Sequence, residues 1–183
     1  VSMRREYPVP VRIVLDKQQT PALTRFLEEL APDIARDVID ISHGGAPAVL
    51  AMAETMQQGG IVGLLADRAR GGEHCIRVPF LGSPAPFSVA PWQLAAALHV
   101  PVVLCFGAYL GGRRYRVAFE PFSEGIQLAR RRRDADLRGV VMRYAARLEH
   151  YVRTYPYNWF NFHDFWRSPE HVEPADSPAG CEP

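Results

Sequence analysis

The sequence contains no run of apolar residues that approaches the length of about 18 needed for a transmembrane helix. No secretory signal peptide opens the chain either. We therefore expect any contact with a membrane to be peripheral. The three cysteines, Cys75, Cys105 and Cys181, show no C-x-x-C spacing, which favours free thiols in a reducing compartment.

Charge and motif content argue against several other classes of protein. The net charge of +1 over 183 residues gives no general attraction for nucleic acid. His-Gly-Gly at 43–45 is similar to an esterase oxyanion loop, but the chain has no G-x-S-x-G nucleophile turn. The glycine pairs at 59–60 and 71–72 lack the spacing of a dinucleotide or phosphate loop. With 48% hydrophobic residues, the chain can bury one core without a disulfide or metal, and we expect no cofactor.

A short apolar segment followed by a charged pair is the most informative stretch of the chain. Residues 61–65 are apolar around one glycine and follow a Gly-Gly break, which predicts a short interior strand. Asp67 and Arg68 then lie at the carboxyl end of that strand, the edge at which open α/β sheets bind ligands. Arginine carries a fork of donors suited to phosphate, and Arg77 is a third, weaker candidate. A structural ion pair between Asp67 and Arg68 is the alternative.

Alternating strand and helix patterns predict an α/β fold. Strands are expected at residues 9–15, 38–41, 61–65, 75–80, 100–109 and 114–119, and helices at 21–30, 48–58, from 88 or 90 to 99, and from 134 or 136 to 153. A Gly-Gly turn at 111–112 predicts that the last two strands form an antiparallel hairpin. The repeated order implies a mostly parallel, mixed sheet with helices on both faces. We expect one domain over residues 1–167 and a disordered, proline-rich tail at 168–183.

Five motifs in collinear order carry a resemblance to a known family. They are Gly59-Gly60 with the apolar strand and Asp67-Arg68, Val78-Pro79-Phe80-Leu81-Gly82-Ser83-Pro84-Ala85, His99-Val100-Pro101-Val102-Val103, Tyr115-Arg116-Val117-Ala118-Phe119-Glu120-Pro121, and the aromatic segment at 156–166. Over roughly residues 9–167 the chain resembles the bacterial lipid A biosynthesis acyltransferases, within the lysophospholipid acyltransferase superfamily. The resemblance implies an acyltransferase-like fold and transfer of an acyl group from a carrier thioester to a lipid or glycolipid hydroxyl.

The catalytic signature of that family is missing from the body of the chain. It is H-x-x-x-x-D or H-x-x-x-x-E, in which the histidine acts as general base and the carboxylate orients it. Among the histidines only His171, with Asp176, has this spacing, and Pro174 between them breaks a helix in the tail. We therefore expect the motif upstream of Val1, so the fold would lack its amino-terminal part and this chain alone would be inactive. The alternative is a non-catalytic module of the same fold that binds a lipid or a partner.

The resemblance also implies partners and a location. The acyl donor would be acyl-carrier protein or acyl-coenzyme A, with Arg68 and Arg77 contacting its phosphate or thioester oxygens and Asp67 fixing nearby loops. The acceptor would be a lipid or glycolipid at the cytoplasmic face of the bacterial inner membrane. Residues 158–166 differ from the basic W-x-H-R-R-W ending of the lipid A enzymes. They resemble a subgroup associated with aryl-polyene and related pigment pathways, so an aryl-polyene acyl group is a second candidate.

Two further features suit a lipid surface. Arg130, Arg131, Arg132 and Arg133 form a run of four cations, and such runs attract anionic lipid headgroups. They are candidate membrane-docking residues, and a solvated loop offset by Asp134 and Asp136 is the alternative. The densest aromatic cluster suits an acyl chain or a membrane interface, and ordinary core packing is its alternative. Its members are Trp159, Phe160, Phe162, Phe165 and Trp166.

Overall fold

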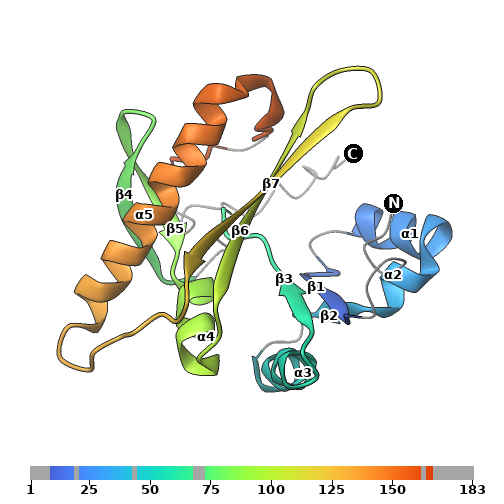
Figure 1. Cartoon of the computed structure of the whole chain (residues 1–183), viewed down its shortest axis with the longest axis horizontal. Coiled ribbons are helices and arrows are strands. Elements are labelled where there is room, and N and C mark those ends of the chain that lie inside the picture. Colours follow the sequence, from blue (N-terminus) through green and yellow to red (C-terminus); the bar gives the residue numbers. More distant parts are fainter. Residues whose placement is uncertain (1–8, 19–20, 43–44, 68–72, 162–163, 167–183) are drawn as a thin grey trace, which may run out of the picture. The chain divides into compact units, whose positions relative to one another are not determined.

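The structure is a computed structural model that describes residues 9–18, 21–42, 45–67, 73–161 and 164–166. The chain divides into two compact units, Val1–Leu65 and Ala66–Pro183 (Figure 1). Each unit has its own strands and helices. The predicted tail at 168–183 lies outside the described residues.

The first unit is built on a three-stranded parallel sheet. Its strands are β1 (Val11–Leu15), β2 (Val38–Asp40) and β3 (Ile61–Gly63), in the order β2-β1-β3. Two helices, α1 (Pro21–Leu30) and α2 (Pro32–Arg36), connect β1 to β2, and α3 (Gly45–Gln57) connects β2 to β3. α3 packs on β2 and β3. It buries Ala48, Met52 and Thr55, whose spacing places them on one helix face.

The glycine pair that ends α3 has a steric cause. Gly59 has a φ of +71°, the left-handed conformation that ends many helices. A Cβ on Gly60 would lie 2.6 Å from the carbonyl oxygen of Thr55 and 2.8 Å from that of Pro10. The amide of Gly60 donates to the Thr55 carbonyl at 2.8 Å, and that of Ile61 donates to the Pro10 carbonyl at 2.7 Å. The close approach therefore connects the end of α3 to the start of β3 beside β1.

The second unit contains two antiparallel strand pairs. β4 (Cys75–Phe80) pairs with β5 (Ser83–Ser88), and β6 (Val102–Tyr109) pairs with β7 (Tyr115–Ser123). The helix α4 (Ala90–Leu98) lies between the two pairs in the sequence. The long helix α5 (Arg133–Thr154) follows β7 and leads into a 3-10 turn, η2 (Pro156–Asn158). α5 contacts β4, α4 and η2, so it is the element around which the unit packs.

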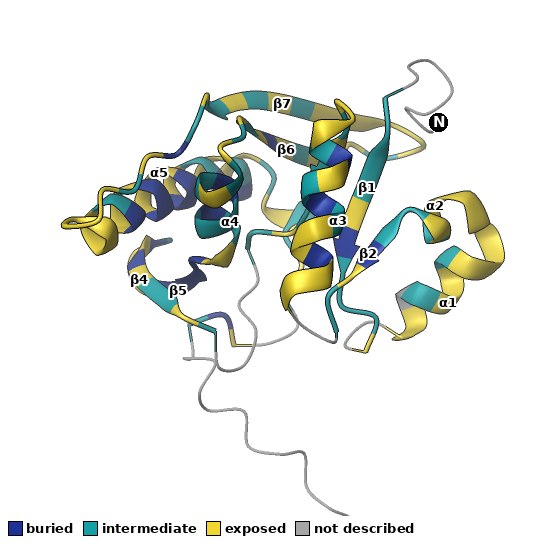
Figure 2. Ribbon diagram, turned by 90° about the horizontal axis from the view of Figure 1, so that it is seen from below, coloured by how far each residue is buried: buried dark blue, intermediate teal, exposed yellow. Residues whose placement is uncertain are grey.

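The core of the second unit lies along one face of α5. Buried residues recur every three or four positions on this helix, and Figure 2 shows them as dark bands that alternate with exposed ones. They pack against the fully or almost fully buried side chains of the β4–β5 pair and the residue after it. The α5 members are Leu137, Val140, Val141, Tyr144, Ala145, Leu148 and Val152, and those facing them include Val78, Phe80, Ala85, Phe87 and Val89.

The α/β class predicted from the sequence is confirmed. The parallel arrangement is found in β1, β2 and β3, and the predicted hairpin is formed by β6 and β7. β5 and α2 are additional elements that the sequence patterns did not predict. Among the described residues, no helix is both long and apolar enough to span a bilayer.

Two expectations about element ends are wrong. The sequence predicts an interior strand that reaches residue 65, but β3 stops at Gly63. It is an edge strand of its three-stranded sheet, and Ile61 is 50% exposed. Arg132 occupies the N-cap position of α5, which was predicted for Asp134 or Asp136. The helix starts earlier because the amide of Asp136 already donates to the carbonyl oxygen of Arg132 at 2.9 Å. The Asp136 carboxylate instead accepts a hydrogen bond from the amide of Ala129 at 2.9 Å, in the turn before the helix.

Candidate functional site

Asp67, the first predicted site residue, belongs to the second unit and lies beyond the end of β3. It is half-buried. Its negative charge raises the pKa of Tyr144 on α5, adding to the larger effect of burial of that phenol. Tyr144 is only 6% exposed and therefore stays neutral at physiological pH. The structure thus associates Asp67 with α5, while its predicted partner Arg68 lies outside the described residues.

Arg77 of β4 binds backbone carbonyl groups of two other segments. Its Nη2 atom donates hydrogen bonds to the carbonyl oxygens of Pro84 at 2.8 Å and Trp166 at 3.1 Å. These bonds connect β4 to β5 and to the aromatic segment near the carboxyl end. No hydrogen bond or ion pair joins Asp67 to Arg77 in the described part of the chain. Arg77 therefore has a structural role, and substrate binding by either residue stays a prediction.

The run from Arg130 to Arg133 is exposed and covers the turn before α5 and the first residue of that helix. No ion pair joins these side chains to another described residue. Each positive charge at a helix amino end is unfavourable by roughly 0.3–1 kcal/mol, because the helix dipole is positive there. Asp134 and Asp136 in the first turn offset part of this. The four arginines therefore do not stabilise α5, and their docking role stays a prediction.

A groove with a volume of about 420 Å³ lies where α5 meets β4. Its surface is mostly apolar, with a few polar groups that include an imidazole and a guanidinium. Its volume falls within the range of small-molecule sites, but it is an open groove at the surface. The residues that line it are Pro79 of β4 and Met142, Ala146, Glu149, His150 and Arg153 of α5.

Glu149, in the wall of the groove, has both carboxylate oxygens engaged. Oε2 accepts a hydrogen bond from the amide of Leu81 at 2.8 Å, and Oε1 accepts one from Nε of Arg153 at 2.8 Å. The bond from Leu81 and then that from Arg153 lower the pKa of Glu149, so it is ionised at neutral pH. The His150 ring forms no hydrogen bond with a carboxylate of the described residues. Within the described part of the structure, the His150 ring therefore lacks the orienting carboxylate that the family's catalytic signature supplies.

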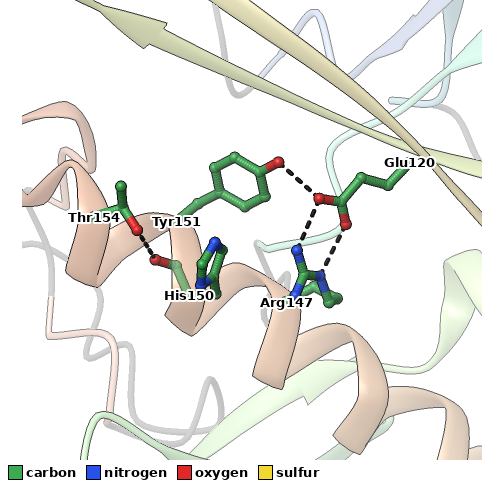
Figure 3. A network of polar contacts seen from close by, with 5 residues as sticks. All are labelled: Glu120, Arg147, His150, Tyr151 and Thr154. Carbon is green, nitrogen blue, oxygen red and sulfur yellow. Dashed lines mark hydrogen bonds and ion pairs between the residues drawn. The ribbon is translucent and has the colours of Figure 1, made fainter.

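A second polar cluster joins β7 to α5 (Figure 3). Nε and Nη2 of Arg147 donate to the two carboxylate oxygens of Glu120, both at 2.8 Å, and the Tyr151 hydroxyl donates to the same carboxylate at 2.7 Å. The bonds from Arg147 and then Tyr151 lower the pKa of Glu120, and the bond with Glu120 raises the pKa of Arg147 and of Tyr151. Tyr151 also stacks on Phe106 of β6, with ring centroids 3.9 Å apart. Glu120 is the acid of the Tyr115–Pro121 motif, so that acid has a structural role here.

The aromatic segment near the carboxyl end packs into the core. The ring centroid of the fully buried Phe80 is 5.4 Å from the centroids of Phe87, Trp159 and Phe165. Trp166 also packs against this core. Core packing, the alternative to a lipid-facing role, therefore applies to three members of the predicted cluster. Phe160 is 66% exposed, and Phe162 lies outside the described residues.

The groove was not predicted from the sequence, although one signal of it is present. Met142, Ala146, His150 and Arg153 recur at intervals of three and four residues along the predicted last helix. Such spacing places them on one face, away from the apolar stripe that is buried. The contribution of Pro79 could not be predicted, because it depends on how β4 packs on α5.

The α/β fold and the groove define a protein with a site suited to a ligand that has an apolar part. The chain matches the family model described as bacterial lipid A biosynthesis acyltransferase over residues 15–168, and it belongs to that family. The comparison with curated proteins gives no match. Family membership confirms the resemblance and indicates acyltransferase activity in general, with an acyl donor and a lipid acceptor as partners.

Proposed function

We propose that the chain is the substrate-holding part of an acyltransferase that moves a fatty acyl group from a carrier thioester to a lipid or glycolipid hydroxyl. The observation that carries the proposal is the family match over residues 15–168. The reaction would take place at the cytoplasmic face of the bacterial inner membrane, with acyl-carrier protein or acyl-coenzyme A as donor. An aryl-polyene acyl group is the alternative transferred group, because the motif at residues 158–166 differs from the corresponding motif of the lipid A enzymes.

The groove between α5 and β4 supports this proposal through its chemistry. Pro79, Met142 and Ala146 offer an apolar surface for methylene groups. His150 and Arg153 line the same groove and can contact a phosphate or a thioester oxygen. The Arg153 side chain is 63% exposed, although it pairs with Glu149 at 2.7 Å. We infer that the groove receives part of the acyl donor.

The base is proposed to come from a segment that this sequence does not include. The H-x-x-x-x-D spacing occurs only at His171 and Asp176, in the proline-rich tail. His150, which lines the groove, has no carboxylate bonded to its ring among the described residues. Asp67, Arg68 and Arg77 would then assist donor binding rather than the chemical step.

The test is acyl transfer from labelled acyl-carrier protein and acyl-coenzyme A to a total membrane lipid extract. The chain is compared with a form extended upstream to include an H-x-x-x-x-D motif, and with Asp67→Ala and Arg68→Ala in that extended form. We expect activity only in the extended form, reduced by either substitution at unchanged folding. Transfer by the 183-residue chain alone would refute the proposal that the base comes from a segment outside this sequence. Lipid binding without activity in any form would favour the non-catalytic module.

A further inference from the structure

The tip of the β6–β7 hairpin exposes large aromatic side chains beside arginines. Tyr109 and Tyr115, at the ends of the two strands, are 48% and 70% exposed, and Leu110 is 37% exposed. Arg113 and Arg114 follow in the turn, and residues 99–119 contain no aspartate or glutamate. The tip is therefore both cationic and rich in exposed aromatic surface.

The shape of the tip is fixed by the backbone. Gly111 and Gly112 have φ values of +88° and +65°, which favour glycine because other side chains are strained there. The amide of Leu110 donates to the carbonyl oxygen of Arg114 at 2.9 Å and closes the turn. The rings of Tyr109 and Tyr115 then lie side by side, with centroids 5.2 Å apart.

A second segment adds an aromatic residue to the tip. The Asn158 side chain of η2 accepts a hydrogen bond from the amide of Tyr109 and donates one to its carbonyl oxygen. Nη1 of Arg116 donates to the Tyr155 hydroxyl at 2.8 Å. These bonds hold η2 beside the end of β6, and with it Tyr157, which is 90% exposed. The aromatic tip thus consists of Tyr109, Leu110, Arg113, Arg114, Tyr115 and Tyr157.

We propose that the aromatic tip docks into the surface of an anionic lipid bilayer. Tyrosine rings favour the interface between headgroups and acyl chains, because their apolar body and polar hydroxyl are both satisfied there. Arginines with no acidic neighbour are attracted to anionic headgroups. The tip therefore matches a bilayer in both charge and amphipathic character. The inference deepens the proposed function by naming a surface through which the protein reaches its lipid acceptor.

The aromatic tip is distinct from the Arg130–Arg133 run. The run lies at the start of α5, whose first residue is Arg133, whereas the tip lies beside η2, which follows the last turn. α5 has 22 residues and is about 33 Å long, and Figure 1 shows the turn between β6 and β7 and the start of α5 at opposite ends of the second unit. The run has four cations, and residues 123–133 contain no aromatic side chain. Binding through it would be purely electrostatic and strongly screened by salt.

The experiment measures sedimentation of the 183-residue chain with vesicles of phosphatidylcholine mixed with phosphatidylglycerol, and with vesicles of phosphatidylcholine alone. One variant carries Tyr115→Ser and Tyr157→Ser, and a second carries Arg113→Gln and Arg114→Gln. The matched controls are Phe26→Ser, at an aromatic residue of the first unit that is 56% exposed, and replacement of Arg130–Arg133 by glutamine. All these positions are exposed and lie outside the core, and circular dichroism checks that each variant is folded.

We expect the tyrosine variant to bind at least about tenfold more weakly, because two large side chains would no longer leave water. The arginine variant should lose about 30-fold in affinity for the anionic vesicles only, as expected for two cations near such a surface. Phe26→Ser should bind like the unmodified chain. At high salt the tyrosine variant should still bind more weakly than the unmodified chain, whereas the effect of the arginine variant should shrink because salt screens its charges. The proposal is overturned if the unmodified chain does not bind, if both tip variants bind normally, or if only the Arg130–Arg133 variant loses binding. Vesicle binding needs no acyl donor, so this outcome is independent of acyl transfer.

Discussion

Arg147 on α5 and Glu120 on β7 form a two-bonded ion pair in which both N···O distances are 2.8 Å. The Tyr151 hydroxyl binds the same carboxylate, and its ring stacks on Phe106 of β6. One cluster therefore connects the long helix to both strands of the hairpin whose tip is proposed to meet the membrane. These four side chains therefore contribute to the orientation of that hairpin relative to α5.

Replacing Glu120 by glutamine should make the second unit less stable at neutral pH but not at acid pH. The folded-state pKa of Glu120 lies below its unfolded value of about 4.3. Its stabilising effect is therefore fully present above that value and is lost as the pH falls through the folded pKa. The Arg147 and Glu120 side chains are 42% and 27% exposed, so solvent weakens their ion pair. We therefore expect Glu120→Gln to lower the free energy of unfolding by no more than about 1 kcal/mol at pH 7. The measurement is urea unfolding at a series of pH values.

Tryptophan fluorescence reports this unfolding specifically, since Trp92, Trp159 and Trp166 all lie in the second unit. Glu124→Gln is the matched control, because Glu124 is exposed and forms no ion pair with a described residue. The stability difference between Glu120→Gln and the unmodified chain should shrink from about pH 5 to pH 3. A difference that stays constant over this range would contradict the assigned role of the carboxylate.

Gly60→Ala should destabilise the first unit through a steric clash. The added Cβ would lie 2.6 Å and 2.8 Å from the backbone carbonyl oxygens of Thr55 and Pro10, which cannot move away as a flexible side chain could. We expect a cost of about 2–3 kcal/mol. The measurement is hydrogen exchange of the amides in β1 and β3, which should become faster as the first unit loses stability. Gly45→Ala is the control, because a Cβ there would meet nothing within 4 Å, and its exchange should not increase.

Phe80→Ala should strongly destabilise the second unit. Phe80 is fully buried and its ring touches those of Phe87, Trp159 and Phe165. Removal of a core phenylalanine costs about 3–5 kcal/mol. Phe119→Ala, at a position 58% exposed, should change stability by no more than about 0.5 kcal/mol. Equal effects of the two substitutions on the urea midpoint would show that the aromatic segment does not depend on Phe80.

Elements with local signals could be predicted from the sequence. The Gly111-Gly112 turn between two apolar strands predicted the β6–β7 hairpin. An acidic start at Asp134 or Asp136 predicted the long helix α5, although the structure places its N-cap at Arg132. β5 was missed because Pro84 and Pro86 lack the amide that a strand ladder needs, which normally argues against a strand. In the structure they pair with Pro79 and Arg77 of β4, in a two-stranded hairpin where an edge position tolerates proline.

The site could be predicted less well than the fold, because it depends on contacts between distant segments. Asp67 was predicted to lie at a sheet edge with Arg68, which is outside the described residues, so that pairing stays a prediction. The structure adds a relationship that the sequence did not indicate, because the charge of Asp67 raises the pKa of Tyr144. Arg77 was proposed for a phosphate and binds the carbonyl of Trp166, far along the chain. A sequence shows the charge of such residues but not the backbone groups that compete for them. The groove was missed for the same reason, because its lining combines Pro79 of β4 with residues of α5 that lie far from it in the sequence.

Filling the groove tests whether it receives the acyl donor. Ala146→Trp places a large side chain in the groove, whereas Ala135→Trp makes the same change at another exposed position of α5 outside it. Both substitutions are at exposed alanines of the same helix, so once both variants are shown to be folded, a difference between them reports occupancy of the groove. In a binding assay with a fluorescent acyl-coenzyme A, we expect Ala146→Trp to weaken binding by roughly tenfold or more, or about 1.4 kcal/mol. Ala135→Trp should bind as the unmodified chain does. Equal binding by both variants would place the acyl donor elsewhere on the protein, and the groove would then have no part in the proposed function.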